Sequence, residues 1–404
     1  MKGRRLLLTG ATGVMGGWVL REALDRGYTP SVVMRDDSQA QARERLAAVL
    51  GLVDREDALD SVAIYRGDTR KPFFGLATAE ATSLRENLGG IIHCAACTSF
   101  DPKRDEEVWD TNVNGVRNIL EFVKGTGIHL YHVSTAYLSG TRQGRVFEAD
   151  LDQNQTFHNT YERSKLEGER QIHKAFESGR TRGAIFRPSI IVGDVERGAI
   201  SQFQNFYNFL RLLDMAATGR FRGSAQMRVV GNPDATKNLV TVDWTAKALW
   251  HIIDNEGPSN QVYHLTNNDP ISLRSLETWT RFLLEPAGFD VRLVRELEGD
   301  ISSLEAIFET RFKHYRAYFE GEPIFDRTNT DRALDGALPL PEFGPELYTT
   351  LLAYARECRW SALFAGRGTV KPKTSVANFP VEERKRPAAV PAAAPECVEA
   401  SAFA

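Results

Sequence analysis

Short apolar runs alternate with amphipathic stretches through the first half of the chain. The runs that predict strands lie at 6–8, 31–34, 61–65, 90–94, 129–133 and 183–186. Between several of them, apolar positions three and four residues apart predict helices at 39–50, 113–124 and 161–176. Strands that alternate with helices form a parallel sheet covered by helices on both faces. We therefore predict an α/β fold with a doubly wound parallel sheet.

The alternation ends near residue 195. Residues 200–216 are rich in Phe, Tyr and Leu, and most of 271–365 predicts helices and connecting loops. From residue 366 the composition shifts to Lys, Pro and Ala, which is typical of a disordered tail. We therefore expect a sheet-containing domain over 1–270, a smaller, mainly helical region over 271–365, and a disordered tail over 366–404.

A glycine-rich turn follows the first predicted strand and precedes a helix. It runs Thr9-Gly10-Ala11-Thr12-Gly13-Val14-Met15-Gly16. In such a turn the first glycine permits the tight bend, the second lets backbone amides approach a pyrophosphate, and the third lets helix and strand pack closely. The helix N-terminus then faces the negative charge. The pattern predicts a Rossmann-type dinucleotide site, and the alternative is a plain turn between strand and helix.

Composition and charge exclude several classes of protein. Hydrophobic residues make up 42% and charged residues 25%, which is ordinary for a soluble globular protein. The net charge of −3 gives no basis for a nucleic-acid surface. No apolar run reaches the roughly 18 residues of a membrane helix, and the three leucines after Arg5 are too few for a secretory signal. Four cysteines do not form a disulfide framework in a chain of this length, so we expect a cytoplasmic enzyme.

A tyrosine and a lysine lie one helical turn apart at the start of the helix predicted over 161–176. Because Tyr161 and Lys165 are four residues apart, both side chains project from one face, and a nearby ammonium lowers the pKa of a phenol. The fifth predicted strand ends in Val133-Ser134-Thr135. Ligands of open parallel sheets bind at the carboxyl ends of the strands, so Thr135 and Tyr161 are expected to face one substrate oxygen there. The alternative is a chance pair and a polar strand end.

These motifs resemble those of extended short-chain dehydrogenase/reductases. The chain looks most like the branch that holds thioester reductases, the reductase domains of carboxylic acid reductases, and fatty acyl reductases. The resemblance covers about residues 4–270. Besides the glycine-rich turn and the Tyr-x-x-x-Lys pair, it is carried by Val33-Met34-Arg35, Arg45-Leu46, Gly67-Asp68, His93-Cys94-Ala95-Ala96, Asn112-Val113-Asn114-Gly115, Val133-Ser134-Thr135, Arg187-Pro188-Ser189-Ile190-Ile191-Val192-Gly193 and Asn238-Leu239-Val240-Thr241-Val242-Asp243.

The resemblance implies roles for individual residues. Thr135, Tyr161 and Lys165 are the implied catalytic set: Tyr161 donates the proton, Lys165 lowers its pKa and holds the nicotinamide ribose, and Asn112 completes a proton relay. Residues 1–270 become the NAD(P)-binding domain, with substrate-site segments from about 195, and 271–365 the substrate-binding region. The implied cofactor-binding residues are Thr9, Gly10, Thr12, Gly13, Val14, Met15, Gly16, Arg35, Arg45, Asp68, Thr69, Cys94, Ala95, Ala96, Ser134, Tyr161, Lys165, Arg187, Pro188, Ser189 and Ile190.

The charge after the second predicted strand bears on the choice of cofactor. An acidic residue at this position favours NAD, whereas an arginine accommodates the additional phosphate of NADP. Arg35 occupies the position, and Arg45 corresponds to a second arginine of the resembling branch, although Asp36 follows directly. We expect NADPH, with NAD as the alternative.

The expected reaction is NADPH-dependent reduction of an acyl thioester, carried on coenzyme A or a carrier protein, to an aldehyde and then to an alcohol. The alternatives are a ketone/alcohol dehydrogenase, a nucleotide-sugar epimerase or dehydratase, and a non-catalytic scaffold. The aromatic stripe at Phe203, Phe206, Tyr207, Phe209, Leu210 and Leu213 predicts core packing or the wall of an acyl channel. Cys94 and Cys97 lack a second pair at zinc-ligand spacing, so we expect no metal. We expect a monomer or a homodimer.

Overall fold

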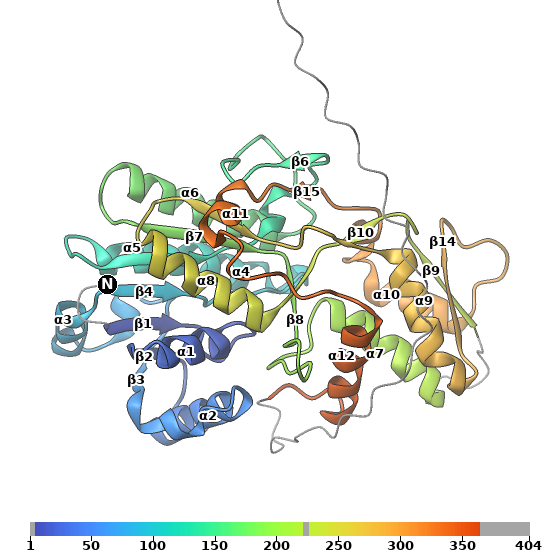
Figure 1. The fold of residues 1–404 in the computed structure, drawn as a ribbon, viewed down its shortest axis with the longest axis horizontal. Coiled ribbons are helices and arrows are strands. Elements are labelled where there is room, and N and C mark those ends of the chain that lie inside the picture. Colours follow the sequence, from blue (N-terminus) through green and yellow to red (C-terminus); the bar gives the residue numbers. More distant parts are fainter. Residues whose placement is uncertain (1–4, 221–225, 364–404) are drawn as a thin grey trace, which may run out of the picture.

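The structure, a computed structural model, describes residues 5–220 and 226–363. Within these residues, seven strands form one parallel sheet in the order β12-β7-β5-β4-β1-β2-β3 (Figure 1). The strands are β1 (Arg5–Thr9), β2 (Thr29–Met34), β3 (Ala63–Arg66), β4 (Gly90–His93), β5 (His129–Val133), β7 (Gly183–Pro188) and β12 (Val262–Leu265). The predicted doubly wound α/β fold is confirmed. The strand order reverses between β1 and β4, which places the ligand crevice at their carboxyl ends.

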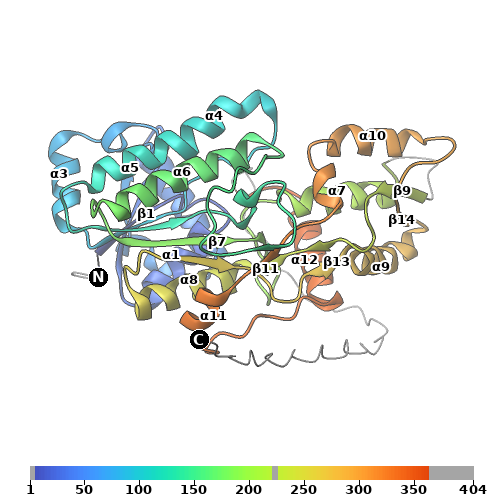
Figure 2. The same cartoon turned by 90° about the horizontal axis from the view of Figure 1, so that it is seen from above.

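Helices cover both faces of the sheet (Figure 2). On one face α1 (Gly16–Asp25) packs against α8 (Val242–Glu256), and on the other α5 (Gly115–Val123) packs against α6 (Thr160–Glu177). Successive side chains of a strand point to opposite faces. Accordingly, Leu6 and Leu8 belong to the core under α1 and α8, whereas Leu7 belongs to the core under α5 and α6. The apolar run at 6–8 is thus buried on both sides, as expected for a central parallel strand.

The helix predicted over 113–124 is part of a longer, irregular one. It begins as α4 (Asp105–Trp109), passes through a π-helical turn (Asp110–Asn114) and continues as α5. Such turns insert an extra residue into a helix and often occur at functional sites. The sequence pattern gave no sign of this turn. The other helices around the sheet are α2 (Gln39–Leu52), α3 (Thr78–Asn87) and α11 (Thr328–Leu334).

A second, smaller region adjoins the carboxyl ends of the central strands, at the right of Figure 1. It contains α7 (Phe206–Met215), α9 (Leu273–Leu284), α10 (Ser303–Phe312), α12 (Pro345–Glu357) and the parallel pair β9 (Gln226–Val230) and β14 (Asp290–Val294). Segments on both sides of residue 270 therefore share this region. The division at 270 stays a prediction, and the predicted tail over 366–404 lies outside the described residues.

Besides the β9–β14 pair, three short two-stranded ladders lie outside the central sheet. They pair β8 (Ile190–Val192) with β11 (Leu239–Thr241), β10 (Thr236–Lys237) with β13 (Ile271–Ser272), and β6 (Arg145–Val146) with β15 (Ile324–Phe325), and this count refers to residues 5–220 and 226–363. The β6–β15 ladder brings the segment near residue 324 back to the sheet domain. This return places later side chains beside the crevice.

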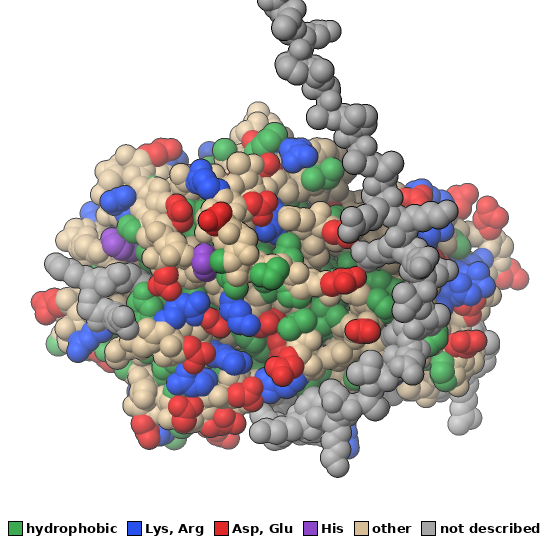
Figure 3. Space-filling view, in the orientation of Figure 1, with side chains coloured by type: hydrophobic (Ala, Val, Ile, Leu, Met, Phe, Trp, Pro, Cys, Tyr) green, Lys and Arg blue, Asp and Glu red, His purple; other side chains and the backbone are tan. Residues whose placement is uncertain are grey.

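The surface carries both signs of charge. On the face in Figure 3, Lys and Arg side chains are interspersed with Asp and Glu side chains. Every helix in the described part of the chain is too short or too polar to span a bilayer.

Candidate functional site

The glycine-rich turn has a geometry that only glycine tolerates. Gly10 has a φ of +75°, and a Cβ there would lie 2.5 Å from the nitrogen of Ala95. A Cβ at Gly16 would lie 2.0 Å from the carbonyl oxygen of Gly10. The amide of Gly13 donates to that same carbonyl at 2.9 Å. Side chains at the first and third glycines would therefore collide with backbone and push the turn apart.

The turn fits the pyrophosphate of a dinucleotide. Helix α1 begins directly after it, and among the described residues no side chain caps its N-terminus and no acidic residue lies in its first turn. The first amides of α1 are therefore left to bind an anion. Thr9 holds the turn to the loop after β4, because its Oγ1 lies 2.6 Å from His93 Nδ1 and accepts from the Ala95 amide at 3.3 Å.

A cavity of about 920 Å³ opens beside this turn and joins the two regions of the chain. Many of the residues predicted to bind the cofactor or to act on the substrate line it together. They are Gly13, Val14, Met15, Cys94, Ala96, Ser134, Thr135, Tyr161, Lys165, Pro188, Ser189 and Ile190.

Tyr161 and Thr135 meet in this cavity, as predicted from the strand end and the helix start. The Thr135 hydroxyl lies near enough to the phenol to favour its ionised form. Burial raises the pKa of Tyr161 to about 12, although the nearby Thr135 hydroxyl opposes the shift. The phenol is therefore protonated at neutral pH and is positioned to donate a proton, together with Thr135, to a substrate oxygen.

Lys165 is buried one turn along α6 from Tyr161. Its Nζ donates to the Val133 carbonyl at 2.8 Å, which aims the ammonium at the end of β5. Burial lowers the pKa of Lys165 to about 8, although the carboxylate of Glu169 opposes the shift. The side chain therefore lies beside the crevice as expected, and its effect on the Tyr161 phenol stays a prediction.

Asn112 lies in the π-helical turn and holds two segments together. Its Oδ1 accepts from the Cys97 amide at 2.8 Å, and its Nδ2 donates to the Cys97 carbonyl and to Ser164 Oγ, both at 2.9 Å. These bonds fasten the loop after β4 to helix α6, which carries Tyr161. The structure thus gives Asn112 a positioning role, and its part in a proton relay stays a prediction.

Arg187 was predicted to bind the cofactor, but it does not line the cavity. Its guanidinium makes an ion pair with Glu169 of α6, with Nε 3.0 Å from Oε1, and only 1% of the side chain is exposed. A buried guanidinium requires a carboxylate partner, and α6 supplies one away from the cavity wall. Pro188, Ser189 and Ile190 line the cavity, whereas Arg187 stabilises the wall from behind.

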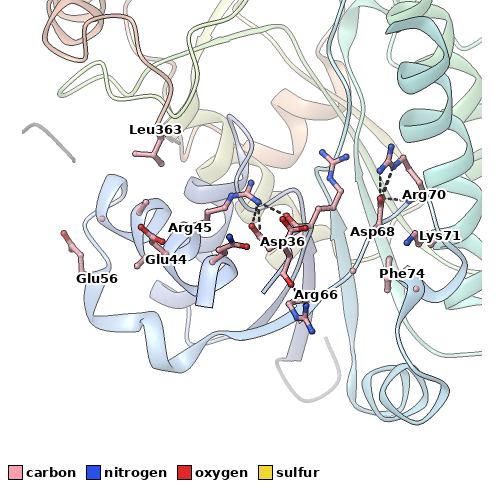
Figure 4. A pocket seen from close by; sticks show the side chains of 18 residues that line it. Asp36, Glu44, Arg45, Glu56, Arg66, Asp68, Arg70, Lys71, Phe74 and Leu363 are labelled. Carbon is pink, nitrogen blue, oxygen red and sulfur yellow. Dashed lines mark hydrogen bonds and ion pairs between the residues drawn. The ribbon is translucent and has the colours of Figure 1, made fainter. Parts of the chain in front are cut away.

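A second hollow, of about 1280 Å³, lies at the ends of β2 and β3 (Figure 4). Figure 4 shows Arg45 turned toward Asp36 and Arg70 turned toward Asp68. Arg45 Nη1 lies 2.9 Å from both carboxylate oxygens of Asp36, and Arg70 Nη2 lies 2.6 Å from Asp68 Oδ2. The side chain of Arg35 lines this hollow and the larger cavity alike, so the two are neighbours.

The charges of this hollow are largely balanced in pairs. Burial opposes ionisation of Asp68, but the bonds from Arg70 outweigh it and lower the pKa of that carboxyl. Arg45 Nη2 also donates to Thr12 Oγ1 at 3.3 Å, which ties helix α2 to the glycine-rich turn. Thr69 is buried, and its carbonyl accepts from Asn118 Nδ2 at 2.9 Å. Arg35, Arg45 and Asp68, three of the residues predicted to bind the cofactor, thus line this hollow, whereas Thr69 is not among its lining residues.

The segment after residue 200 covers the glycine-rich turn. The sequence did not predict this contact. Ser201 Oγ donates to the Gly13 carbonyl at 3.1 Å, and Gln202 Nε2 donates to the Thr12 carbonyl at 3.4 Å. The aromatic stripe that follows is divided between the cavity wall and the core, and its role in an acyl channel stays a prediction. Phe206 and Phe209 line the cavity, whereas the remaining members, Phe203, Tyr207, Leu210 and Leu213, are buried in the core.

Glu162 is a further buried carboxyl beside the site. Tyr318, from a turn that lines the cavity, donates to its Oε1, and the His158 amide donates to its Oε2 at 2.9 Å. Burial raises the pKa of Glu162 to about 7, although both donors oppose the shift. The hydrogen bond between Tyr318 and Glu162 therefore fastens the smaller region to the start of α6.

Replacing Glu162 by Gln should flatten the pH dependence of stability. The folded-state pKa of about 7 lies above the usual 4.5, so the folded protein holds this proton more tightly than the unfolded chain. The contribution of this carboxyl to the unfolding free energy should therefore fall by about 1–3 kcal/mol as the pH rises from 4.5 to 7. In urea unfolding, the change in unfolding free energy between the two pH values should be more positive by this amount in Glu162→Gln than in the wild type. The half-exposed control Glu167→Gln should behave like the wild type. An equal change in all three proteins would contradict the assignment.

Cys94 lines the cavity but is a poor nucleophile. Burial raises the pKa of its thiol to about 12, although the charge of Lys165 opposes the shift. The thiol is therefore protonated at neutral pH, which disfavours redox or metal chemistry at this position.

Known proteins resemble this chain in sequence and fold. A family model described as male sterility protein matches residues 8–249. The nonribosomal peptide synthetase asaC of Aspergillus flavus is 29% identical over 366 residues, covering 82% of this chain and 34% of that protein. The fatty acyl-CoA reductase wat of Drosophila melanogaster is 25% identical over 283 residues, covering 62% of this chain and 51% of that protein. The chain thus spans about a third to a half of the length of these two curated relatives.

The fold has a close match among solved structures. The terminal R domain from the myxalamid PKS-NRPS biosynthetic pathway gives a TM-score of 0.76 at 22% identity, covering 89% of this chain and 93% of that one. The match includes both the sheet and the smaller region. The family model spans residues 8–249, which is more than half of the length of this chain. The chain therefore belongs to the male sterility protein family, an NAD(P)-binding branch of the extended short-chain dehydrogenase/reductases.

Proposed function

We propose that the protein is an NADPH-dependent reductase of acyl thioesters carried on coenzyme A or on a carrier protein. The observation that carries the proposal is that Thr135 and Tyr161 line the same cavity as the glycine-rich turn and Lys165, with the Thr135 hydroxyl near the phenol. The relatives named above support the thioester, because they include a nonribosomal peptide synthetase and a fatty acyl-CoA reductase.

The residues act on the carbonyl oxygen of the thioester. Thr135 and Tyr161 both hydrogen-bond this oxygen and stabilise the negative charge that develops on it. A bound reduced nicotinamide supplies hydride to the carbonyl carbon. Tyr161 donates its proton to the oxygen, and the hemithioacetal that forms collapses to an aldehyde and a free thiol. A second round at the aldehyde gives the alcohol.

Lys165 and the cavity walls prepare this step. The ammonium of Lys165 lies near the end of β5 and stabilises the phenolate that Tyr161 becomes when it gives up its proton. Around the reacting carbon, Phe206, Phe209 and Ile190 exclude water. In such surroundings the hydrogen bonds to the oxygen are stronger than in water.

The choice of NADPH is supported by the pairing at the adenosine end. Asp36 is the carboxylate that would otherwise bind the free ribose hydroxyls of NAD, and Arg45 neutralises it through both of its oxygens. Arg35 lines the same hollow and supplies positive charge for an additional phosphate. The arrangement therefore favours the phosphorylated cofactor.

Replacing Arg35 by Ala should reduce kcat/KM for NADPH by about 10–100-fold, because a charge-assisted hydrogen bond contributes about 1.5–3 kcal/mol. The value for NADH should change less than about threefold. Steady-state kinetics with both cofactors measures the ratio. Arg43→Ala serves as the control, since Arg43 is half-exposed on α2 and pairs with Asp60. An equal loss with NADPH and NADH would show that Arg35 does not recognise the phosphate.

The proposed reaction is tested by following NADPH oxidation with a panel of substrates. Acyl thioesters on coenzyme A and on a carrier protein form one arm, and ketones and sugar nucleotides form the other. We expect turnover in the thioester arm, with an aldehyde or alcohol as product. Robust turnover of ketones with no turnover of thioesters would overturn the proposal in favour of an alcohol dehydrogenase.

A further inference from the structure

A buried lysine on the cavity wall has hydrogen-bonding capacity that the described part of the protein does not use. Lys237 of β10 lines the cavity, and only 8% of its side chain is exposed. Its Nζ lies 3.6 Å from Glu322 Oε2, which is an ion pair longer than an ordinary hydrogen bond. Among residues 5–220 and 226–363 no group accepts a hydrogen bond from this Nζ. A buried donor without a partner costs about 1–3 kcal/mol, so a ligand oxygen is favoured there.

Its partner Glu322 has the complementary feature. The Oε2 atom accepts from the Tyr137 hydroxyl at 2.7 Å, whereas Oε1 has no donor in the described part of the chain. The side chain of Glu322 is only 2% exposed. Lys237 lines the cavity and Glu322 does not, so Glu322 balances the lysine charge from behind the wall. The Nζ of Lys237 is therefore the group of this pair that a ligand in the cavity can reach.

The pair lies close to the proposed reaction centre. Tyr137, which holds Glu322, follows Thr135 by two residues, and its amide donates to Thr135 Oγ1 at 3.3 Å. On the other side, the charge of Lys237 contributes to a lowered pKa of His158, which lies just before helix α6. A group that reaches the pair is therefore a few bonds from the carbonyl held by Thr135 and Tyr161.

The charges decide which group fits. Lys237 and Glu322 together are neutral, so a carboxylate on the ligand would add an uncompensated charge in a buried site. A plain alkyl chain would leave the Lys237 donor without a partner. An amide offers its carbonyl oxygen, a strong acceptor without a net charge, to the ammonium.

We propose that Lys237, with its charge balanced by Glu322, determines substrate specificity by binding the carbonyl oxygen of an amide group in the acyl chain, a few bonds from the thioester carbon. This inference rests on the proposed function, because it assumes that the acyl chain occupies the cavity. It selects N-acylaminoacyl or peptidyl thioesters over simple fatty acyl thioesters.

The test compares two pantetheine thioesters of equal chain length, N-butyrylglycyl and heptanoyl. Without NADPH neither is reduced, so calorimetry gives their dissociation constants directly. The wild type should bind the amide at least about tenfold more tightly, as expected for one charge-assisted hydrogen bond. In Lys237→Met this ratio should fall toward one, whereas the exposed control Lys124→Met should retain it. Equal binding of both thioesters by the wild type, or an unchanged ratio in Lys237→Met, would overturn the inference.

A second variant separates specificity from a structural role. Glu322→Gln leaves the lysine charge without its counter-charge, so this variant should gain affinity for a succinyl thioester, which a general loss of packing would not produce. If Glu322→Gln gained no affinity for the succinyl thioester, the proposed role of the Lys237–Glu322 pair in specificity would be contradicted. Adding NADPH afterwards tests the proposed function separately. If the protein prefers the amide in binding but reduces neither thioester, the proposed reductase activity is refuted, whereas the proposed role of Lys237 in binding is retained.

Discussion

Replacing Tyr161 by Phe should lower kcat for thioester reduction by about 10²–10⁴-fold, the usual contribution of a positioned general acid. The change removes only the hydroxyl, so the buried ring still packs 5.8 Å from the ring of Phe100. It deletes both the proton that the substrate oxygen receives and one of the two hydrogen bonds to that oxygen. The dissociation constant of NADPH should change little, because the phenol acts on the substrate. Stopped-flow kinetics and a fluorescence titration of the cofactor measure the two effects.

The matched control is Tyr263→Phe, which also removes a hydroxyl from a buried tyrosine. Tyr263 lies on β12, and its hydroxyl lies 2.9 Å from Ser259 Oγ, away from the cavity. This control should retain kcat within about threefold, since its hydroxyl does not line the cavity and bonds only a neighbouring side chain. If the Tyr161→Phe variant retained the wild-type kcat, the phenol would have no role in the mechanism. Cofactor binding without turnover in the wild type itself would favour the non-catalytic scaffold.

Much of the sheet domain could be predicted because its signals are local. The glycine-rich turn needs Gly10 and Gly16 for steric reasons that act within a few residues, and the apolar run at 6–8 identifies a central strand. The Tyr161–Lys165 spacing fixes both side chains on one helix face. Since strands of a parallel sheet end at the same edge, the meeting of Thr135 with Tyr161 followed from the order of elements alone.

The contacts that close the cavity could not be predicted, because they join segments far apart in the chain. Tyr318 bonds Glu162 across 156 positions, and Ser201 bonds Gly13 across 188. Neither contact has a motif or a periodicity, since each depends on how the smaller region packs on the sheet domain. The same holds for the Lys237–Glu322 pair. Tertiary packing alone brings these side chains together.

Arg187 shows how a motif can be located correctly while one of its side chains is misplaced. Residues 188–190 line the cavity as expected, but the guanidinium points to Glu169 of α6. Resemblance places the backbone of the motif, whereas the direction of the side chain depends on where a buried carboxylate is available. The helix that carries Tyr161 and Lys165 is therefore anchored from behind by an ion pair.

Replacing Arg187 by Met should destabilise the protein by about 3–5 kcal/mol, because removing one partner of a buried ion pair leaves the other charge uncompensated. Burial opposes ionisation of Glu169, but the Arg187 guanidinium outweighs it and lowers the pKa of that carboxyl to about 2. In the wild type this pair stabilises the fold above the usual pKa of 4.5, and the stabilisation is lost as the pH falls toward 2. In Arg187→Met the carboxyl instead prefers its proton, so the loss should be larger at pH 8 than at pH 4.

Urea unfolding of wild type and variant at the two pH values measures this difference. Arg180→Met is the control, since Arg180 is 42% exposed and its ion pair with Glu121 should contribute less than about 1 kcal/mol. The double variant Arg187→Met/Glu169→Gln should recover part of the lost stability, because it removes the uncompensated carboxylate. A loss below about 1 kcal/mol in Arg187→Met, independent of pH, would mean that the ion pair does not anchor α6. Because Tyr161 and Lys165 lie on the same helix, a real loss of the anchor should also reduce kcat under conditions where the variant is still folded.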